Sequence, residues 1–137
     1  MSDTEVTKQA TTAKVISVLL IEDDKAISSM YQRRFDFEGG FNITIANNGQ
    51  EGLNDLKTLN PDVILLDMMM PVMSGLETLK LIRQLPNGKS LKIIALTNMN
   101  DSDTSQTIVD LGVTDHIIKA NTTPGVIVEK VRELASR

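Results

Sequence analysis

The chain has 137 residues, of which 41% are hydrophobic and 23% charged, and it carries a net charge of −4. This length and composition are ordinary for one soluble globular domain with a proper core. Cysteine is absent and His116 is the only histidine, which excludes disulfides, thiolate metal sites, a cysteine nucleophile and a multi-histidine metal site. Lys and Arg are scattered, so we expect no direct binding to nucleic acid.

The first segment, MSDTEVTKQATTAK at 1–14, is polar and lacks the apolar core of a secretory signal. No apolar run approaches the roughly 20 residues that are needed to cross a bilayer. We therefore expect a flexible tail at 1–14, a single domain at 15–137, a cytoplasmic location and no membrane attachment.

The first apolar run, VISVLLI at 15–21, is continuous, as is typical of parallel strands that are covered on both faces. The segment 25–38 follows with a helical pattern. Its apolar residues fall on roughly one side of a helix: Ile27, Met30, Tyr31, Phe35 and Phe37. The next run, FNITIAN at 41–47, alternates apolar and polar residues, so we place this strand at a sheet edge, where one face is wetter.

In GLNDLKTLN at 52–60, leucine recurs every third residue, which predicts a helix. The continuous run VILLD at 63–67 predicts a buried strand. The pattern of SGLETLKLIRQL at 74–85 predicts a helix with Ser74 as its N-cap. Two sequences are interpreted as turns only, NGQEG at 48–52 and NGK at 87–89.

The run LKIIALT at 91–97 predicts the fourth strand, and DSDTSQTIVDLG at 101–112 predicts a helix that is polar at its start. The short run HIIK at 116–119 predicts the fifth strand. The last helix, TTPGVIVEKVREL, is expected to have Thr123 as its N-cap and Pro124 at its first position.

Strands and helices therefore alternate five times with short connections. Strict alternation predicts an α/β fold, a (βα)5 doubly wound parallel sheet with helices on both faces. Five strands with the second at an edge fit the order 2-1-3-4-5.

Acidic residues stand at the ends of two strands that are neighbours in this order. Glu22 and Asp23 follow the first strand, and Asp67 ends the third. Ligands of open α/β sheets bind at such a switch point, at the carboxyl ends of the strands. Three close carboxylates repel unless a cation joins them, and an all-oxygen set favours Mg²⁺. The competing interpretation is helix capping, which we favour for Asp24 alone.

Two more strand ends bring complementary groups to the same rim. The fourth strand ends in the hydroxyl of Thr97, and the fifth ends in the ammonium of Lys119. Taken alone, each residue has a purely structural interpretation: Thr97 as a residue that favours strands, and Lys119 as a solvated strand end. Together with Asp67 they supply a carboxylate nucleophile and donors for phosphoryl oxygens, which indicates phosphoryl transfer.

At this point the sequence resembles the receiver domain of two-component response regulators. The matching segments are VLLIEDDKAI, PDVILLDMMMPVMSG, IIALT and DHIIK, which occur in the family's order. The resemblance implies a signalling module, not an enzyme beyond its own phosphorylation and dephosphorylation, in which Asp67 accepts a phosphoryl group from a phosphohistidine. The donor would be a sensor histidine kinase or a phosphotransfer protein.

The resemblance also implies the roles of the surrounding residues. Asp23, Asp67 and the backbone carbonyl of Met69 would bind Mg²⁺ directly, and Glu22 would act through water. Thr97 and Lys119 would each bind a phosphoryl oxygen. The surface formed by the predicted helix at 101–112, the strand at 116–119 and the last helix would then change for a downstream protein, as a monomer or as a phosphorylation-dependent dimer. Its charged residues include Asp101, Asp103, Asp110, Asp115, Lys130 and Arg132.

Three positions depart from the family pattern. Ala120 stands where proline usually follows the lysine through a cis bond, so this bond is either trans with a reshaped loop or strained. His116 stands where the family has its switch aromatic, and the competing interpretation is a solvated histidine. Asn98 replaces a usually small residue, and we expect it to narrow access to Asp67. The side chains of MMM at 68–70 are interpreted as packing and access control, not metal ligands.

The leading hypothesis is a stand-alone response regulator, and the main alternative is a pseudo-receiver that acts without phosphorylation. A phosphatase of the haloacid dehalogenase type would need a second acid two residues after its nucleophile, where this chain has Met69. A flavodoxin-type module would need a phosphate loop after the first strand, where EDDKA stands instead.

Overall fold

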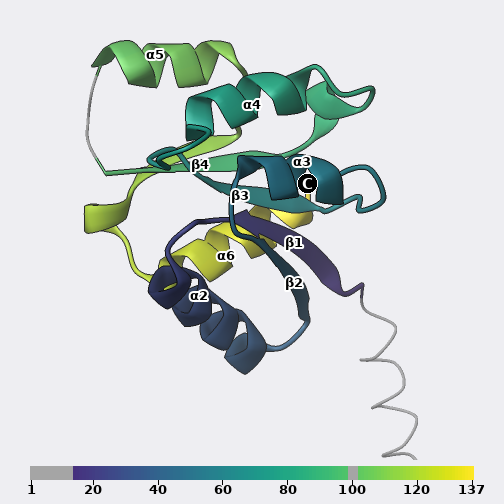
Figure 1. The fold of residues 1–137 in the computed structure, drawn as a ribbon. Helices are drawn as coiled ribbons and strands as arrows, with labels where there is room; N and C mark the ends of the chain where they lie inside the picture. Colours follow the sequence, from purple (N-terminus) through teal and green to yellow (C-terminus); the bar gives the residue numbers. More distant parts are fainter. Residues whose placement is uncertain (1–13, 99–101) are drawn as a thin grey trace, which may run out of the picture.

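The structure is a computed structural model that describes residues 14–98 and 102–137. It contains a parallel sheet of five strands in the order β2-β1-β3-β4-β5, which confirms the predicted order 2-1-3-4-5 (Figure 1). The strands are β1 (Ile16–Ile21), β2 (Phe41–Ala46), β3 (Val63–Asp67), β4 (Ile93–Thr97) and β5 (Asp115–Ile118).

Helices cover both faces of this sheet, as Figure 1 shows. They are α2 (Lys25–Glu38), α3 (Gly49–Asp55), α4 (Gly75–Arg83), α5 (Ser102–Asp110) and α6 (Pro124–Ala135). One apolar cluster joins the sheet to α3, α4 and α5. A second cluster joins the opposite face to α2 and α6. Among the described residues, no helix has both the length and the apolar character that a bilayer crossing requires.

The continuous apolar runs serve both clusters at once. Leu19 and Ile21 of β1 pack toward α3–α5, whereas Val18 and Leu20 pack toward α2 and α6. Every residue of β3 and β4 is buried, as expected for strands with neighbours on both sides and helices on both faces. β2 and β5, at the edges, are mostly half-buried, which explains why the alternating run at 41–47 predicted an edge.

For the helix at 25–38, the prediction that its apolar residues share one buried side was wrong for Met30 and Phe37. Tyr31 and Phe35 are buried, but 81% of Phe37 and 37% of Met30 are exposed. Successive residues of a helix are rotated by about 100°, so Phe35 and Phe37 cannot face the same way. The guanidinium of Arg34 instead lies 5.8 Å from the centre of the Phe37 ring.

Both segments that were interpreted as turns contain helical structure. Asn48 is the N-cap of α3, and its side chain accepts a hydrogen bond from the N–H of Glu51 at 2.8 Å. A Cβ on Gly49 would lie 2.1 Å from Oγ1 of Thr78, so glycine allows α3 to approach α4 closely. The other segment forms a short 3-10 helix, η1 (Gly88–Ser90). At Asn48 and Gly49 the asparagine–glycine pair starts a helix, so the prediction of a turn only was wrong for the segment that forms α3.

The predicted N-caps are confirmed. Ser74 forms a capping box with Glu77 at the start of α4. Thr123 caps α6, with Pro124 at the first helical position. Of the predicted tail at 1–14, only Lys14 is among the described residues, and its ammonium pairs with Asp62 at 2.6 Å.

Arg83, at the end of α4, joins three parts of the chain. Its guanidinium donates hydrogen bonds to four backbone carbonyls, those of Gly88, Leu91, Leu111 and Gly112. The first two lie between α4 and β4, and the other two lie between α5 and β5. One side chain therefore ties the end of α5 to the end of α4.

Replacing Arg83 with methionine should lower the free energy of unfolding by about 3 kcal/mol, because partly buried carbonyls lose a charged donor. Urea denaturation measures this loss. Arg33→Met is the matched control, since Arg33 is exposed on α2, and it should cost less than about 0.5 kcal/mol. Equal losses in the two variants would show that the Arg83 bonds are not stabilising.

Candidate functional site

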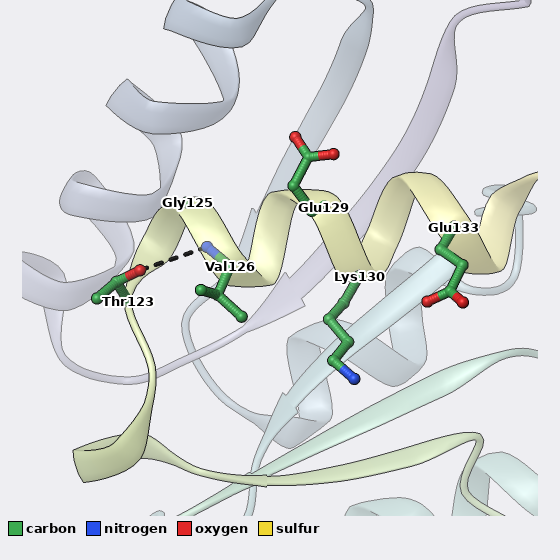
Figure 2. Close-up of a pocket in the computed structure, with 6 residues that line it drawn as sticks. All are labelled: Thr123, Gly125, Val126, Glu129, Lys130 and Glu133. Atoms are coloured by element: carbon green, nitrogen blue, oxygen red, sulfur yellow. Dashed lines mark hydrogen bonds between the residues drawn. The ribbon is translucent and has the colours of Figure 1, made fainter.

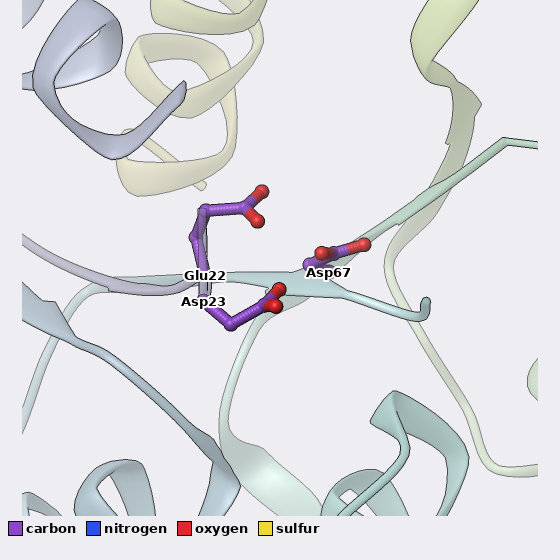
Figure 3. A group of neighbouring side chains, drawn as sticks. All are labelled: Glu22, Asp23 and Asp67. Carbon is purple, nitrogen blue, oxygen red and sulfur yellow. The ribbon is translucent and has the colours of Figure 1, made fainter. Parts of the chain in front are cut away.

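The structure brings Glu22, Asp23 and Asp67 together at the carboxyl ends of β1 and β3. These strands pair in parallel with Ile21 opposite Leu66, so Glu22 and Asp67 lie level with each other. One carboxylate oxygen from each of the three residues lies within 4.8 Å of the others (Figure 3). Only 1% of Glu22 and 1% of Asp67 is exposed, whereas Asp23 is exposed at the rim.

Backbone hydrogen bonds fix Glu22 after β1, whereas the Asp24 side chain bonds to the start of α2 instead of joining the carboxylate cluster. The N–H of Glu22 donates to the carbonyl of Ala46, and Glu22 Oε2 accepts from the N–H of Asp24 at 3.1 Å. The Asp24 carboxylate caps α2 by accepting from the N–H groups of Ala26 and Ile27 at 2.8 and 3.2 Å. The interpretation of Asp24 as a helix cap is therefore confirmed.

Asp67 is held where β3 passes into the loop that leads to α4. Its Oδ1 accepts from the N–H of Met69 at 3.0 Å. A Cβ on Gly75 would lie 2.3 Å from the Met68 Cα and 2.4 Å from the Asp67 carbonyl oxygen. Glycine at the first position of α4 therefore lets this helix pack directly against the backbone of Asp67.

The methionines that follow Asp67 divide into core and surface. Met68 and Met70 are buried and belong to the cluster beneath α3–α5, as the packing interpretation predicted. Half of Met69 is exposed beside the rim.

Lys119 reaches the carboxylates from the other side. It belongs to a short 3-10 helix, η2 (Lys119–Asn121), so β5 ends one residue earlier than expected. Its ammonium lies 3.0 Å from Asp67 Oδ1 and 3.2 Å from Glu22 Oε1. No cis peptide bond occurs in the parts of the chain that the structure describes, so the Lys119–Ala120 bond is trans.

Thr97 and His116 lie next to each other on β4 and β5. Thr97 is buried, and its Oγ1 lies 3.3 Å from Nε2 of His116. His116 is half-buried on the edge strand β5, which is less exposure than the competing interpretation of a solvated histidine implied. Asn98, directly after Thr97, is exposed.

Burial and crowding change the protonation of this cluster. Burial raises the pKa of Glu22 to about 7, helped by the hydrogen bond and negative charge of Asp67 and opposed by the N–H of Asp24 and by Lys119. Burial alone would lower the pKa of Lys119, but Asp67 and Glu22 raise it above its usual value. Lys119 therefore stays charged between two acidic groups.

Tyr31 is a buried ionisable residue whose electrostatic link to the site the sequence did not reveal. It is buried on α2, and its pKa is raised by burial, with Lys119, Glu22 and Asp67 all acting on it electrostatically. In the sequence it is one of several apolar residues of an amphipathic helix, so no pattern distinguishes it.

The raised pKa of Glu22 has a consequence for stability without metal. Between about pH 4.5 and about pH 7 the folded chain binds this proton more tightly than the unfolded chain, so the free energy of unfolding falls as pH rises through that interval. We expect Glu22→Gln to flatten this decline, as measured by thermal unfolding in a chelator from about pH 5 to about pH 8.

The control for this measurement is Glu133→Gln, since Glu133 is an exposed carboxylate on α6. It should keep the decline of the unchanged chain. An undiminished decline in the Glu22→Gln variant would contradict the assignment.

Comparison with known proteins agrees with this geometry. The family model of the response regulator receiver domain matches residues 18–132. The probable C4-dicarboxylate response regulator DctR of Priestia megaterium is 37% identical over 107 residues, which cover 77% of this chain and 46% of that protein. The protein-glutamate methylesterase/protein-glutamine glutaminase of Halalkalibacterium halodurans is 36% identical over 87% of this chain and 34% of its own. The chain thus spans less than half the length of these curated relatives.

Solved structures share the whole fold. The chemotaxis protein CheY4 of Vibrio cholerae superposes with a TM-score of 0.80 at 26% identity, over 89% of this chain and 99% of that one. The Francisella response regulator 1452 receiver domain superposes with a TM-score of 0.79 at 30% identity, over 89% of this chain and 98% of that one. Sequence and fold therefore agree over nearly all of the described residues, and the chain belongs to the receiver domain family of two-component response regulators.

Proposed function

We propose that Asp67 is the phosphoacceptor, and that residues 15–137 form the receiver unit around it. The observation that carries this proposal is the contact of the Lys119 ammonium with Asp67 Oδ1 at 3.0 Å, beside two further carboxylates within 4.8 Å. A buried acid with a fixed cation and an acidic rim suits a nucleophile for phosphoryl transfer.

The donor set fits Mg²⁺. Every candidate ligand is an oxygen atom: the carboxylates of Asp23 and Asp67, the carbonyl of Met69 and, through water, Glu22. When bound, Mg²⁺ would offset the charge that develops on the transferring phosphoryl group. A cation would also favour the ionised form of Glu22, against the effect of burial.

The chemistry assigned to the side chains is a simple displacement. A carboxylate oxygen of Asp67 forms a bond to phosphorus while the bond from phosphorus to the donor's imidazole nitrogen breaks, and the product is an acyl phosphate. Lys119 binds one phosphoryl oxygen, and the Thr97 hydroxyl donates to another. The donor is a phosphohistidine of a sensor kinase or a phosphotransfer protein.

The phosphoryl group would act as a switch because it brings nearly two negative charges and three acceptor oxygens into a nearly closed site. Lys119 would then leave Glu22 and bind a phosphoryl oxygen on Asp67. Moving Lys119 and Thr97 pulls on the ends of β5 and β4, next to α5 and α6. We assign the surface formed by α5, β5 and α6 to a downstream protein, or to dimer formation after phosphorylation.

The charges of this surface are partly paired within the chain. Lys130 extends from α6 toward β5, as Figure 2 shows, and its ammonium lies 3.1 Å from Asp115. Arg132 pairs with Glu129 and with Glu38, and Asp110 accepts from Gln106. Asp101 and the side chain of Asp103 lie outside the described residues. A partner would therefore have to compete with Asp115 and Glu129 for these cations.

The pseudo-receiver alternative is not favoured. All five residues that the phosphoryl chemistry requires meet or stand level at one rim: Glu22, Asp23, Asp67, Thr97 and Lys119. A phosphatase of the haloacid dehalogenase type is not supported, because Met69 stands where its second acid would be.

The proposed function predicts a covalent adduct. Incubation with acetyl phosphate and Mg²⁺ should add one phosphoryl group to the intact protein, and omission of Mg²⁺ should remove most of it. Asp67→Asn should abolish the adduct, because the amide lacks the carboxylate oxygen that attacks phosphorus. Intact-protein mass spectrometry measures both results.

Asp24→Asn is the matched control, because asparagine caps a helix as well as aspartate does. This variant removes a carboxylate next to the cluster and should still form the adduct. An Asp67→Asn variant that is phosphorylated like the unchanged chain would refute Asp67 as the acceptor. No adduct under any condition would support the pseudo-receiver.

A further inference from the structure

The imidazole of His116 touches the hydroxyl that is assigned to the phosphoryl group. In the parallel pairing of β4 and β5, Ala95 stands opposite His116 and Thr97 opposite Ile118. Thr97 and His116 are therefore diagonal neighbours on one face of the sheet. Ile117 packs into the cluster on the opposite face, which fixes the side to which His116 points.

The backbone around His116 is held firmly. Its N–H donates to Oδ1 of Asp115 at 2.8 Å, and Oδ2 of Asp115 pairs with Lys130 of α6 at 3.1 Å. The ring is thus presented to Thr97 from a strand position that α6 stabilises. The 3.3 Å between Nε2 and Oγ1 is within hydrogen-bonding range.

The direction of this hydrogen bond decides what Thr97 can do next. A threonine hydroxyl has one proton and two lone pairs. If Nε2 is unprotonated and accepts, the hydroxyl proton points at the ring and is not available to a phosphoryl oxygen. If Nε2 carries a proton and donates, the hydroxyl can donate its own proton toward Asp67.

We propose that His116 is a positioning residue for Thr97 in the phosphorylated protein. Its Nε2–H donates to Oγ1, and the Thr97 hydroxyl donates to a phosphoryl oxygen on Asp67. The two hydrogen bonds then run in sequence, from His116 to Thr97 and from Thr97 to the phosphoryl oxygen. In such a chain each hydrogen bond strengthens the other. The inference rests on the proposed function, since it needs a phosphoryl group at Asp67.

An apolar side chain at position 116 cannot continue this chain, whereas an amide can. Beryllofluoride on Asp67 stands in for the phosphoryl group, and its binding can be followed by ¹⁹F NMR with Mg²⁺ present. We expect His116→Leu to weaken binding about threefold to tenfold, as for the loss of one hydrogen bond. His116→Gln, which keeps an N–H donor, should bind within about twofold of the unchanged chain.

A double-mutant cycle separates positioning from packing. In a Thr97→Val background the hydroxyl is absent, so His116→Leu should cause no further loss. An equal loss with and without the Thr97 hydroxyl would show that His116 acts through packing alone and would overturn the inference. Equal binding by the His116→Leu and His116→Gln variants would do the same.

The single histidine makes a direct observation possible, because every imidazole signal belongs to His116. In ¹⁵N-labelled protein with Mg²⁺ and beryllofluoride, Nε2 should carry a proton that exchanges slowly with water. In the Thr97→Val variant that proton should exchange rapidly. An unprotonated Nε2 in the complex, or the same slow exchange without the Thr97 hydroxyl, would overturn the inference.

The two proposals fail in different ways. A chain that takes neither beryllofluoride nor a phosphoryl group from acetyl phosphate overturns the proposed function and this inference together. Normal binding at Asp67 that is insensitive to the residue at position 116 overturns this inference alone.

Discussion

The rest of the site depends on the confinement of three carboxylates in a nearly closed crevice. Glu22 and Asp67 are almost completely buried and Asp23 stands at their rim, so their mutual repulsion is poorly screened by water. Two devices keep this arrangement stable without metal: the Lys119 ammonium between Asp67 and Glu22, and the raised pKa of Glu22, which allows it to hold a proton. Both devices also prepare the site for its ligands, because a bound cation would replace the proton on Glu22 and a phosphoryl group would draw the Lys119 ammonium from Glu22 to itself.

The sheet topology creates this confinement. Because β1 and β3 are parallel neighbours, Glu22 and Asp67, which are far apart in the sequence, meet at the carboxyl ends of the two strands. The next strands bring Thr97 and Lys119 to the same rim, and Gly75 allows α4 to pack against Asp67. A local change of charge is therefore connected directly to β4, β5 and the helices beside them. Arg83 ties the chain that follows α5 to the end of α4.

Much of the fold could be predicted from the sequence because its signals are local and repeated. Continuous apolar runs indicated the buried strands, and the alternating run at 41–47 indicated the edge. Errors arose where one residue type serves two purposes. Asn48 caps α3, although an asparagine followed by glycine is also typical of turns, and Phe37 is aromatic yet exposed, with Arg34 over its ring. The candidate site was predictable from strand ends, but the double contact of Lys119, the raised pKa of Tyr31 and the contact of His116 with Thr97 depend on side-chain positions that no spacing encodes.

The most direct test of this account is a crystal structure of the protein with Mg²⁺ and beryllofluoride. We predict that beryllium is bonded to a carboxylate oxygen of Asp67, that Mg²⁺ lies among Asp23, Asp67 and the Met69 carbonyl, and that Lys119 has moved from Glu22 to a fluorine atom. A structure in which beryllofluoride is absent from Asp67, or in which Lys119 keeps both of its present contacts, would contradict it.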